Sequence, residues 1–152
     1  GAVIAVFFVT ASPALDFGRA ARSRAAEMAL VQEMKARDPT LRLFVYDGPV
    51  YLYALTEQAP PTPLAFPLHL CFLPERNVSY LDTAGEVRKV LATRPTTVVV
   101  QSNARPPELY NPETRAMVDA YARQCRTRYA RKLLDMYGPV DLDIHTDCEA
   151  HP

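Results

Sequence analysis

The sequence predicts a small layered α/β domain, with a mixed or mostly parallel sheet of about four to five strands flanked by helices. Three observations favour this class. The length of 152 residues suits one domain, and 49% hydrophobic with 22% charged residues is a globular composition. Apolar β-branched runs also alternate with segments of helix-forming residues along the chain.

The other elements are arranged around the stretch from residue 41 to residue 56. Leu41 to Tyr46 is a dense apolar run, which predicts a buried strand. Asp47-Gly48 is typical of a tight turn, and Pro49 suits the first position of a short helix. The alternative is a hairpin in which Val50 to Leu55 returns as a second strand, because tyrosines are common in strands.

A longer helix is predicted before this stretch. Asp16 to Arg37 consists largely of helix formers, and an apolar stripe runs along it through Ala26, Leu30 and Met34. Asp38-Pro39 ends the helix, because the residue before a proline avoids the helical conformation.

Two further helices follow. The first is predicted to end near Thr93 and to begin with a capping box, in which Thr83 is the N-cap and Glu86 its partner. The second begins at Asn111-Pro112 and extends towards Gly138-Pro139. Its apolar stripe recurs every four residues, at Met117, Tyr121, Cys125 and Tyr129.

Three more strands are expected. Leu64 to Leu70 is short and apolar, and Pro67 within it indicates an edge or a bulge. Thr96 to Val100 is continuously apolar enough for the inside of a sheet. Towards the end of the chain, apolar and polar residues alternate as in a half-buried edge strand with an acidic outer face. These residues are Val140, Leu142 and Ile144 against Asp141, Asp143 and His145.

The first residues form an apolar run, Ala2 to Val9. The run is shorter than the ~20 residues that span a bilayer, and no basic region precedes it as in a signal peptide. It is either the end of a transmembrane helix or a buried strand, and we favour the former. The expected divisions are therefore residues 1–15 for this segment, 16–148 for one soluble α/β domain and 149–152 for a frayed tail.

The three cysteines are Cys71, Cys125 and Cys148, and the absence of a C-x-x-C pair excludes a zinc ribbon or a thioredoxin-type motif. Cys125 and Cys148 either pair in an oxidising compartment or are both free thiols, and of the two we favour free thiols. The formal net charge is +0. We interpret the arginines after Asn111 as a solvated helix face, so we expect no nucleic-acid partner.

Four residues are candidates for contact with a ligand: Asp47, His69, Gln101 and Asn103. Three of them follow the carboxyl ends of predicted strands, where open α/β sheets bind ligands, and His69 lies beside a predicted strand. Each also has a structural explanation, as a turn residue or a hydrogen-bonded core histidine.

No phosphate-binding loop or H-E-x-x-H helix is present, so we expect no cofactor and no metal. Asp141-Leu142-Asp143 matches the D-x-D pattern of metal-dependent sugar transferases. The strand alternation explains these two aspartates as well.

Several short motifs occur in a familiar order: Leu41 to Thr62, which ends in the loop Pro60-Pro61-Thr62, then Phe66 to Leu70, and Arg94 to Val100. In this order they resemble the carboxy-terminal region of polytopic membrane glycosyltransferases, those of glycosyltransferase family 39 and the dolichyl-phosphate-mannose mannosyltransferase-like proteins. The resemblance covers roughly residues 19–144. It departs at Glu57-Gln58, where the family usually has Gly-Arg.

The resemblance implies a multi-pass enzyme that transfers a sugar from a polyprenyl-phosphate donor to an extracytoplasmic acceptor. This chain would be its soluble domain on the extracytoplasmic (periplasmic) side of the cell membrane. In that family the catalytic acidic residues lie in an early loop that this sequence does not contain. We therefore carry over no catalytic residue, and we expect the fragment alone to be inactive.

The expected partners follow from the same resemblance. They are the upstream transmembrane domain of the same protein, the lipid-linked sugar donor reached through the parent enzyme, and lipid headgroups near the arginines of the first helix. Two other hypotheses remain. One is a stand-alone soluble α/β module that binds a nucleotide or a sugar. The other is a soluble metal-dependent transferase that uses Asp141 and Asp143.

Overall fold

The computed structural model describes residues 17–102, 105–135 and 138–148. Helices and a four-stranded mixed sheet confirm the α/β class. The main elements are α2 (Phe17–Arg37), β1 (Leu43–Val45), α3 (Tyr51–Leu55), α4 (Leu68–Cys71), α5 (Thr83–Ala92), β2 (Thr97–Gln101), α6 (Pro112–Ala122), β3 (Thr127–Asp135) and β4 (Gly138–Thr146). The 3-10 turns η2 (Leu73–Glu75), η3 (Val78–Tyr80) and η4 (Pro107–Leu109) lie in the connections.

The strands have the order β1-β2-β4-β3. β1 and β2 are parallel, whereas β4 runs antiparallel to both β2 and β3, so the described sheet is mixed rather than mostly parallel. The prediction that β2 lies inside the sheet is confirmed. The prediction that β4 is an edge strand is wrong, because β3 pairs along its outer side from Thr127 to Asp135.

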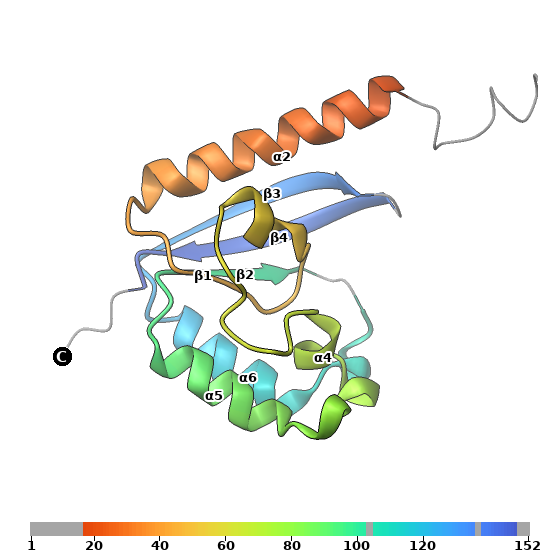
Figure 1. Ribbon diagram of the computed structural model, residues 1–152, viewed down its shortest axis with the longest axis vertical. Helices are drawn as coiled ribbons and strands as arrows, with labels where there is room; N and C mark the ends of the chain where they lie inside the picture. Colours follow the sequence, from red (N-terminus) through yellow and green to blue (C-terminus); the bar gives the residue numbers. More distant parts are fainter. Residues whose placement is uncertain (1–16, 103–104, 136–137, 149–152) are drawn as a thin grey trace, which may run out of the picture.

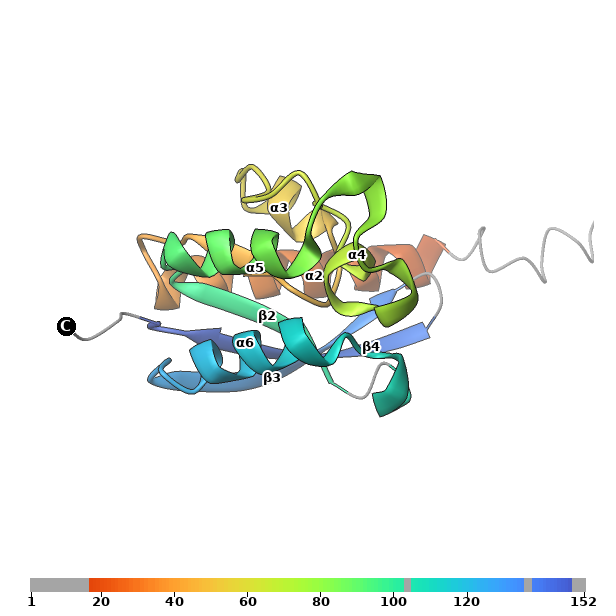
Figure 2. The same cartoon turned by 90° about the horizontal axis from the view of Figure 1, so that it is seen from below.

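Helices cover the two faces of the sheet. Figures 1 and 2 show α2 on one face and α4, α5 and α6 on the other. Each face has its own apolar cluster. The α2 side buries Leu30, Val31, Met34, Leu43, Val45, Leu52, Tyr53, Val99, Leu133, Leu142 and Ile144. The opposite side buries Phe44, Tyr46, Leu64, Leu70, Cys71, Val87, Val90, Val98, Val100, Val118, Tyr121 and Cys148.

Helix α2 agrees with its prediction over the residues described. Leu30 and Met34 are buried, so the apolar stripe packs on the sheet. The backbone N–H of Asp38 bonds the carbonyl of Met34 at 2.9 Å and ends the helix. The Asp38 carboxylate then accepts a hydrogen bond from the Thr97 hydroxyl at 2.9 Å, which ties the helix end to β2.

The connection after β1 is the predicted turn and helix, and the alternative hairpin is wrong. Gly48 has φ +151°, a conformation that suits glycine in a tight turn. Residues 51–55 form α3, whose Tyr53 hydroxyl accepts a 2.8 Å hydrogen bond from the backbone N–H of Val45. Tyr53, a residue type common in strands, therefore anchors a helix to β1.

The two helix starts predicted on the other face have different outcomes. Asn111 is the N-cap of α6, and its side chain accepts hydrogen bonds from the N–H groups of residues 113 and 114, as predicted. The capping box at Thr83 is wrong. Asp82 is the N-cap of α5, while the Thr83 hydroxyl accepts a hydrogen bond from Asn77 N and Glu86 bonds Thr62 and Lys89.

The strand predicted from Leu64 to Leu70 is also wrong. Leu64 and Leu70 are buried as an apolar strand would be, but Pro67 precedes a helical turn, α4. The carbonyl of Pro67 accepts a 3.0 Å hydrogen bond from Cys71 N. A proline preset to helical φ begins a turn more readily than it joins a sheet.

The largest difference concerns the long helix predicted after Asn111. The helix ends at Ala122, and residues 127–135 form β3. Pairing with β4 supplies the hydrogen bonds of this strand, and Tyr129 and Leu133 pack on the α2 side. The tertiary pairing overrides the helix-forming residues in the segment.

Cys125 and Cys148 form a disulfide, so the favoured expectation of free thiols is wrong. Cys71 is a buried free cysteine. The expected segment 1–15 and tail 149–152 lie outside the described residues. No helix in the described part is long and apolar enough to cross a membrane.

Candidate functional site

The parallel strands β1 and β2 end at the same edge of the sheet, where the sequence placed Asp47 and Gln101. Asp47 follows β1, but its side chain points inward and is only 1% exposed. Its carboxylate accepts a 2.8 Å hydrogen bond and ion pair from Nη1 of Arg105. Gln101 is the half-buried last residue of β2. The edge is therefore occupied by an internal ion pair.

Arg105 joins several elements at this edge. Its Nη1 lies 3.5 Å from Sγ of Cys71, and its guanidinium lies 5.9 Å from the ring centroid of Phe72 and 5.6 Å from that of Tyr110. It thus links the end of β1 to α4 and to the segment that leads into α6. The arrangement has the form of a structural cross-brace.

Burial is the largest cause of the pKa shifts of Asp47 and Cys71 in this cluster. Desolvation raises the pKa of Asp47 by more than the Arg105 charge lowers it. Burial and the Asp47 charge raise the pKa of the Cys71 thiol to about 12. A thiol that stays protonated is a poor nucleophile, so we assign Cys71 no covalent chemistry.

The other predicted residues do not join this cluster. His69 lies on α4, where its Nδ1 is 2.9 Å from Oε2 of Glu75 and its ring meets the edge of Phe66. His69 is half-buried, with 32% of its side chain exposed, so it is a partner of Glu75 on α4 rather than a core histidine. Asn103 lies outside the described residues.

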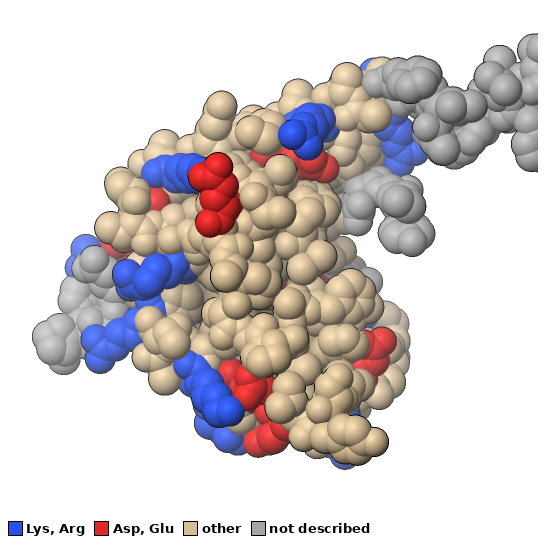
Figure 3. All heavy atoms as spheres, viewed as in Figure 1, with Lys and Arg blue, Asp and Glu red and all other residues tan. Residues whose placement is uncertain are grey.

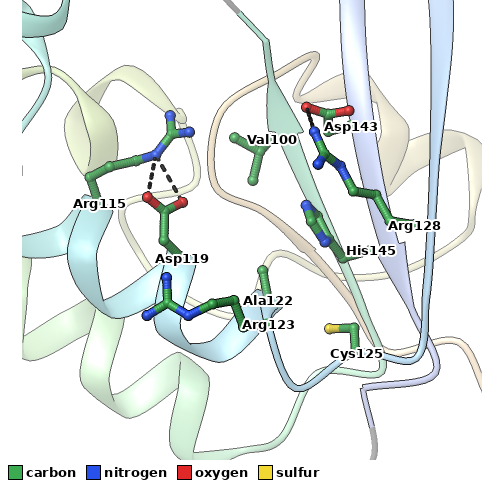
Figure 4. A pocket seen from close by; sticks show the side chains of 9 residues that line it. All are labelled: Val100, Arg115, Asp119, Ala122, Arg123, Cys125, Arg128, Asp143 and His145. Carbon is green, nitrogen blue, oxygen red and sulfur yellow. Dashed lines mark hydrogen bonds and ion pairs between the residues drawn. The ribbon is translucent and has the colours of Figure 1, made fainter.

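A groove lies beside α6 instead (Figure 4). It has a volume of about 430 Å³ and adjoins a second hollow of about 480 Å³, with which it shares Arg115 and Asp119. The groove is lined by Val100, Arg115, Asp119, Ala122, Arg123, Cys125, Arg128, Asp143 and His145. One wall comes from α6 and the residues that follow it, and the other from side chains of β2, β3 and β4.

The two walls of the groove each carry an ion pair. On the helix wall, Nε of Arg115 donates to both carboxylate oxygens of Asp119, at 3.0 and 3.1 Å. On the strand wall, Asp143 accepts from Nη2 of Arg128 at 2.9 Å and from the Ser102 hydroxyl at 2.6 Å. Figure 4 shows the two pairs on opposite sides of the hollow.

The groove has a small positive charge. Burial, assisted by Arg128, lowers the pKa of His145, so this side chain is neutral near pH 7. The three lining arginines and two aspartates then sum to +3 − 2 = +1. The Ser102 hydrogen bond and Arg128 lower the pKa of Asp143 despite its burial, so its carboxylate is ionised.

The D-x-D pair has cationic partners. Asp143 bonds Arg128, and Asp141 lies 3.4 Å from Nζ of Lys132. Within the described part of the chain, no group of three or more acidic, histidine or cysteine side chains is placed to hold a metal ion.

Sequence reasoning missed the groove because it interpreted the arginines after Asn111 as one solvated helix face. A signal was present, since Arg115, Asp119 and Arg123 are spaced by four and share one side of α6. Arg128 was assigned to the same helix, whereas it lies on β3 and faces that side across the groove.

Comparison with known proteins adds no relative. No protein-family model, curated protein or solved structure gives a significant match to the chain.

Proposed function

We propose that the chain is the non-catalytic extracytoplasmic domain of a polytopic membrane glycosyltransferase. The parent enzyme would transfer a sugar from a polyprenyl-phosphate donor to an extracytoplasmic acceptor. The motif order from Leu41 to Val100 supports the family. The proposal depends most on one structural observation, the disulfide between Cys125 and Cys148.

The disulfide supports an oxidising compartment. Cys125 follows α6 and Cys148 follows β4, so the bond closes a loop across the end of the sheet. Disulfides persist in secreted, periplasmic and surface domains and are rare in the cytosol. The location fits a domain on the far side of the cell membrane.

The departure from the family's motif falls at a position whose backbone conformation favours glycine. The family usually has glycine at the position of Glu57, and Glu57 adopts φ +62°, the left-handed conformation that favours glycine. The backbone at this point is thus the one that the family's usual residue would suit.

The first turns of α2 fit a position near lipid. Arg22 and Arg24 are exposed near the N-terminal end of α2, the helix that covers one face of the sheet (Figure 1). Arginines close to a membrane surface are attracted to anionic headgroups.

The proposal is tested by the topology and activity of the complete reading frame that contains this chain. We would express it with a carboxy-terminal tag and treat spheroplasts and inverted vesicles with proteinase K. The tagged domain should be digested in spheroplasts and protected in inverted vesicles. Cys125 and Cys148 should react with maleimide only after reduction, and the membranes should transfer sugar from a polyprenyl-phosphate donor.

Protection in spheroplasts together with freely reactive thiols would overturn the extracytoplasmic position. Membranes without sugar transfer would overturn the parent activity. A product found only in the soluble fraction would favour the second candidate, a stand-alone α/β ligand-binding module. The groove beside α6 is the observation that supports this candidate.

A further inference from the structure

We propose that the groove beside α6 binds an anionic saccharide, a sugar that carries a phosphate or carboxylate group. The binding follows from the side chains of the groove. Only the view that this saccharide is the acceptor of the parent enzyme rests on the proposed function.

The anionic group is recognised by arginine. The Arg123 guanidinium has no hydrogen-bond or ion-pair partner among the described residues, although it lines the groove. Arg115 bonds Asp119 through Nε, and Arg128 bonds Asp143 through Nη2, so each retains further N–H donors. A guanidinium carries five donors in a planar fork that matches phosphate and carboxylate oxygens.

The hydroxyl groups of a sugar match the two aspartates. Asp119 and Asp143 are fixed by their arginines on opposite walls, and an ionised carboxylate can accept more hydrogen bonds than these ion pairs use. A ligand with hydroxyl donors can therefore donate hydrogen bonds to carboxylates on both walls. A simple anion has no such donors and would leave these acceptors unpaired.

The adjoining hollow offers an apolar surface. It is lined by Pro107, Tyr110, Pro112 and Ala116 next to the shared Arg115 and Asp119. The carbon-bound hydrogens of a sugar ring can pack on such side chains while the hydroxyls reach the aspartates. The two hollows together suit a ligand of more than one sugar unit.

A nucleic acid fits this surface poorly. The groove sums to one positive charge and the whole chain to +0, so a polyanion gains little from counterion release. On the face drawn in Figure 3, basic and acidic side chains are interspersed without a field of one sign. The recognition must come from a few placed groups, which suits a small charged saccharide.

The test is a titration of the 152-residue chain, monitored by NMR chemical-shift changes or calorimetry at pH 7. The probes are mannose 6-phosphate, glucuronic acid, mannose and inorganic phosphate. We expect at least one charged sugar to bind with a Kd of about 1 mM or tighter, and more tightly than either mannose or phosphate. The two charged sugars separate the phosphate from the carboxylate as the recognised group.

Arg123→Gln is the informative variant, because its guanidinium holds no other described residue in place. It should weaken binding of the charged sugar about tenfold, the loss of one charge-assisted hydrogen bond. Arg76→Gln is the matched control, since this exposed arginine makes the same charge change outside the groove. It should leave the affinity unchanged.

Three results would overturn the inference: no saturable binding of either charged sugar, inorganic phosphate that binds as tightly as the charged sugars, or equal losses in the two variants. None of these bears on membrane topology, so the proposed function would stand or fall separately. If the domain binds the saccharide but is found in the cytoplasm, the inference about the groove stands and the proposed glycosyltransferase function is refuted.

Discussion

Glu57 occupies a position after helix α3 that favours glycine. The N–H of Glu57 bonds the carbonyl of Ala54 at 3.2 Å, and the N–H of Gln58 bonds that of Tyr53 at 2.9 Å. This pair of bonds is a Schellman motif, whose left-handed residue is usually glycine. Glu57 has φ +62° there and is exposed.

We expect Glu57→Gly to stabilise the domain. A side chain in the left-handed conformation costs roughly 1–2 kcal/mol, which glycine avoids. Glycine in turn destabilises the folded state by roughly 0.5–1 kcal/mol, because it loses more conformational entropy on folding. The net gain is about 0.5–1 kcal/mol in the free energy of unfolding. For a domain of this size the melting temperature should rise by about 1–4 °C.

Urea unfolding of the wild type, Glu57→Gly and Glu57→Ala measures the effect. Alanine removes the carboxylate but keeps the β-carbon, so Glu57→Ala should stay within about 0.5 kcal/mol of the wild type. If Glu57→Ala stabilised the domain and Glu57→Gly left its stability unchanged, the cost would come from the carboxylate charge rather than from the backbone conformation. That result would refute the reasoning.

Two further predictions concern the disulfide and the buried carboxylates. Replacing both Cys125 and Cys148 by serine should lower the free energy of unfolding by about 3 kcal/mol, because the bond closes a loop with a sequence separation of 23. Urea unfolding without reductant measures this, and an unchanged stability would contradict it. The pKa of Asp47 is raised by burial, so its contribution to stability is lost as the pH rises through its folded-state pKa, whereas that of Asp143 is lowered by Ser102 and Arg128, so its contribution is lost as the pH falls. As the pH rises from about 3 to 7, the stability of Asp47→Asn relative to the wild type should therefore increase, and that of Asp143→Asn should decrease. Slopes of the same sign in urea unfolding would refute the assignment.

The sequence was sufficient for elements with strong local signals. Asp38-Pro39 ends α2 and Asn111-Pro112 begins α6, because caps and prolines act within a few residues. The apolar run at Thr96 to Val100 forms the interior strand β2. These are cases in which local preference and global packing agree.

The errors arose where a distant partner decides the structure. Residues 127–135 are rich in helix formers, but the hairpin with β4 makes them a strand. Tyr129 fits a helical stripe spaced by four and also a strand alternation, so only the pairing separates the two. Thr83 fits a capping box, yet its hydroxyl accepts from Asn77, a loop contact that no local pattern encodes.

The candidate site could be predicted only in part. Asp47 was correctly placed at the end of a strand, but whether its carboxylate points outward or meets an arginine depends on Arg105, which is 58 residues away. The groove beside α6 was missed for the same reason that β3 was. Its strand wall exists only once Arg128 and Asp143 are neighbours across the hairpin.

The disulfide and the groove belong to one arrangement, which couples stability to binding. Cys125 lines the groove at the end of α6, and Cys148 follows β4, so the bond joins the two walls. Reduction should let the walls move apart. The affinity for the charged saccharide should then fall several-fold, because a preorganised site binds more tightly. Titration of the folded wild type with and without reductant measures this, and the Cys125→Ser/Cys148→Ser variant should not respond to reductant. An affinity that survives reduction would mean that packing of α6 through Val118 and Tyr121, both buried against the sheet, is enough to hold the groove open.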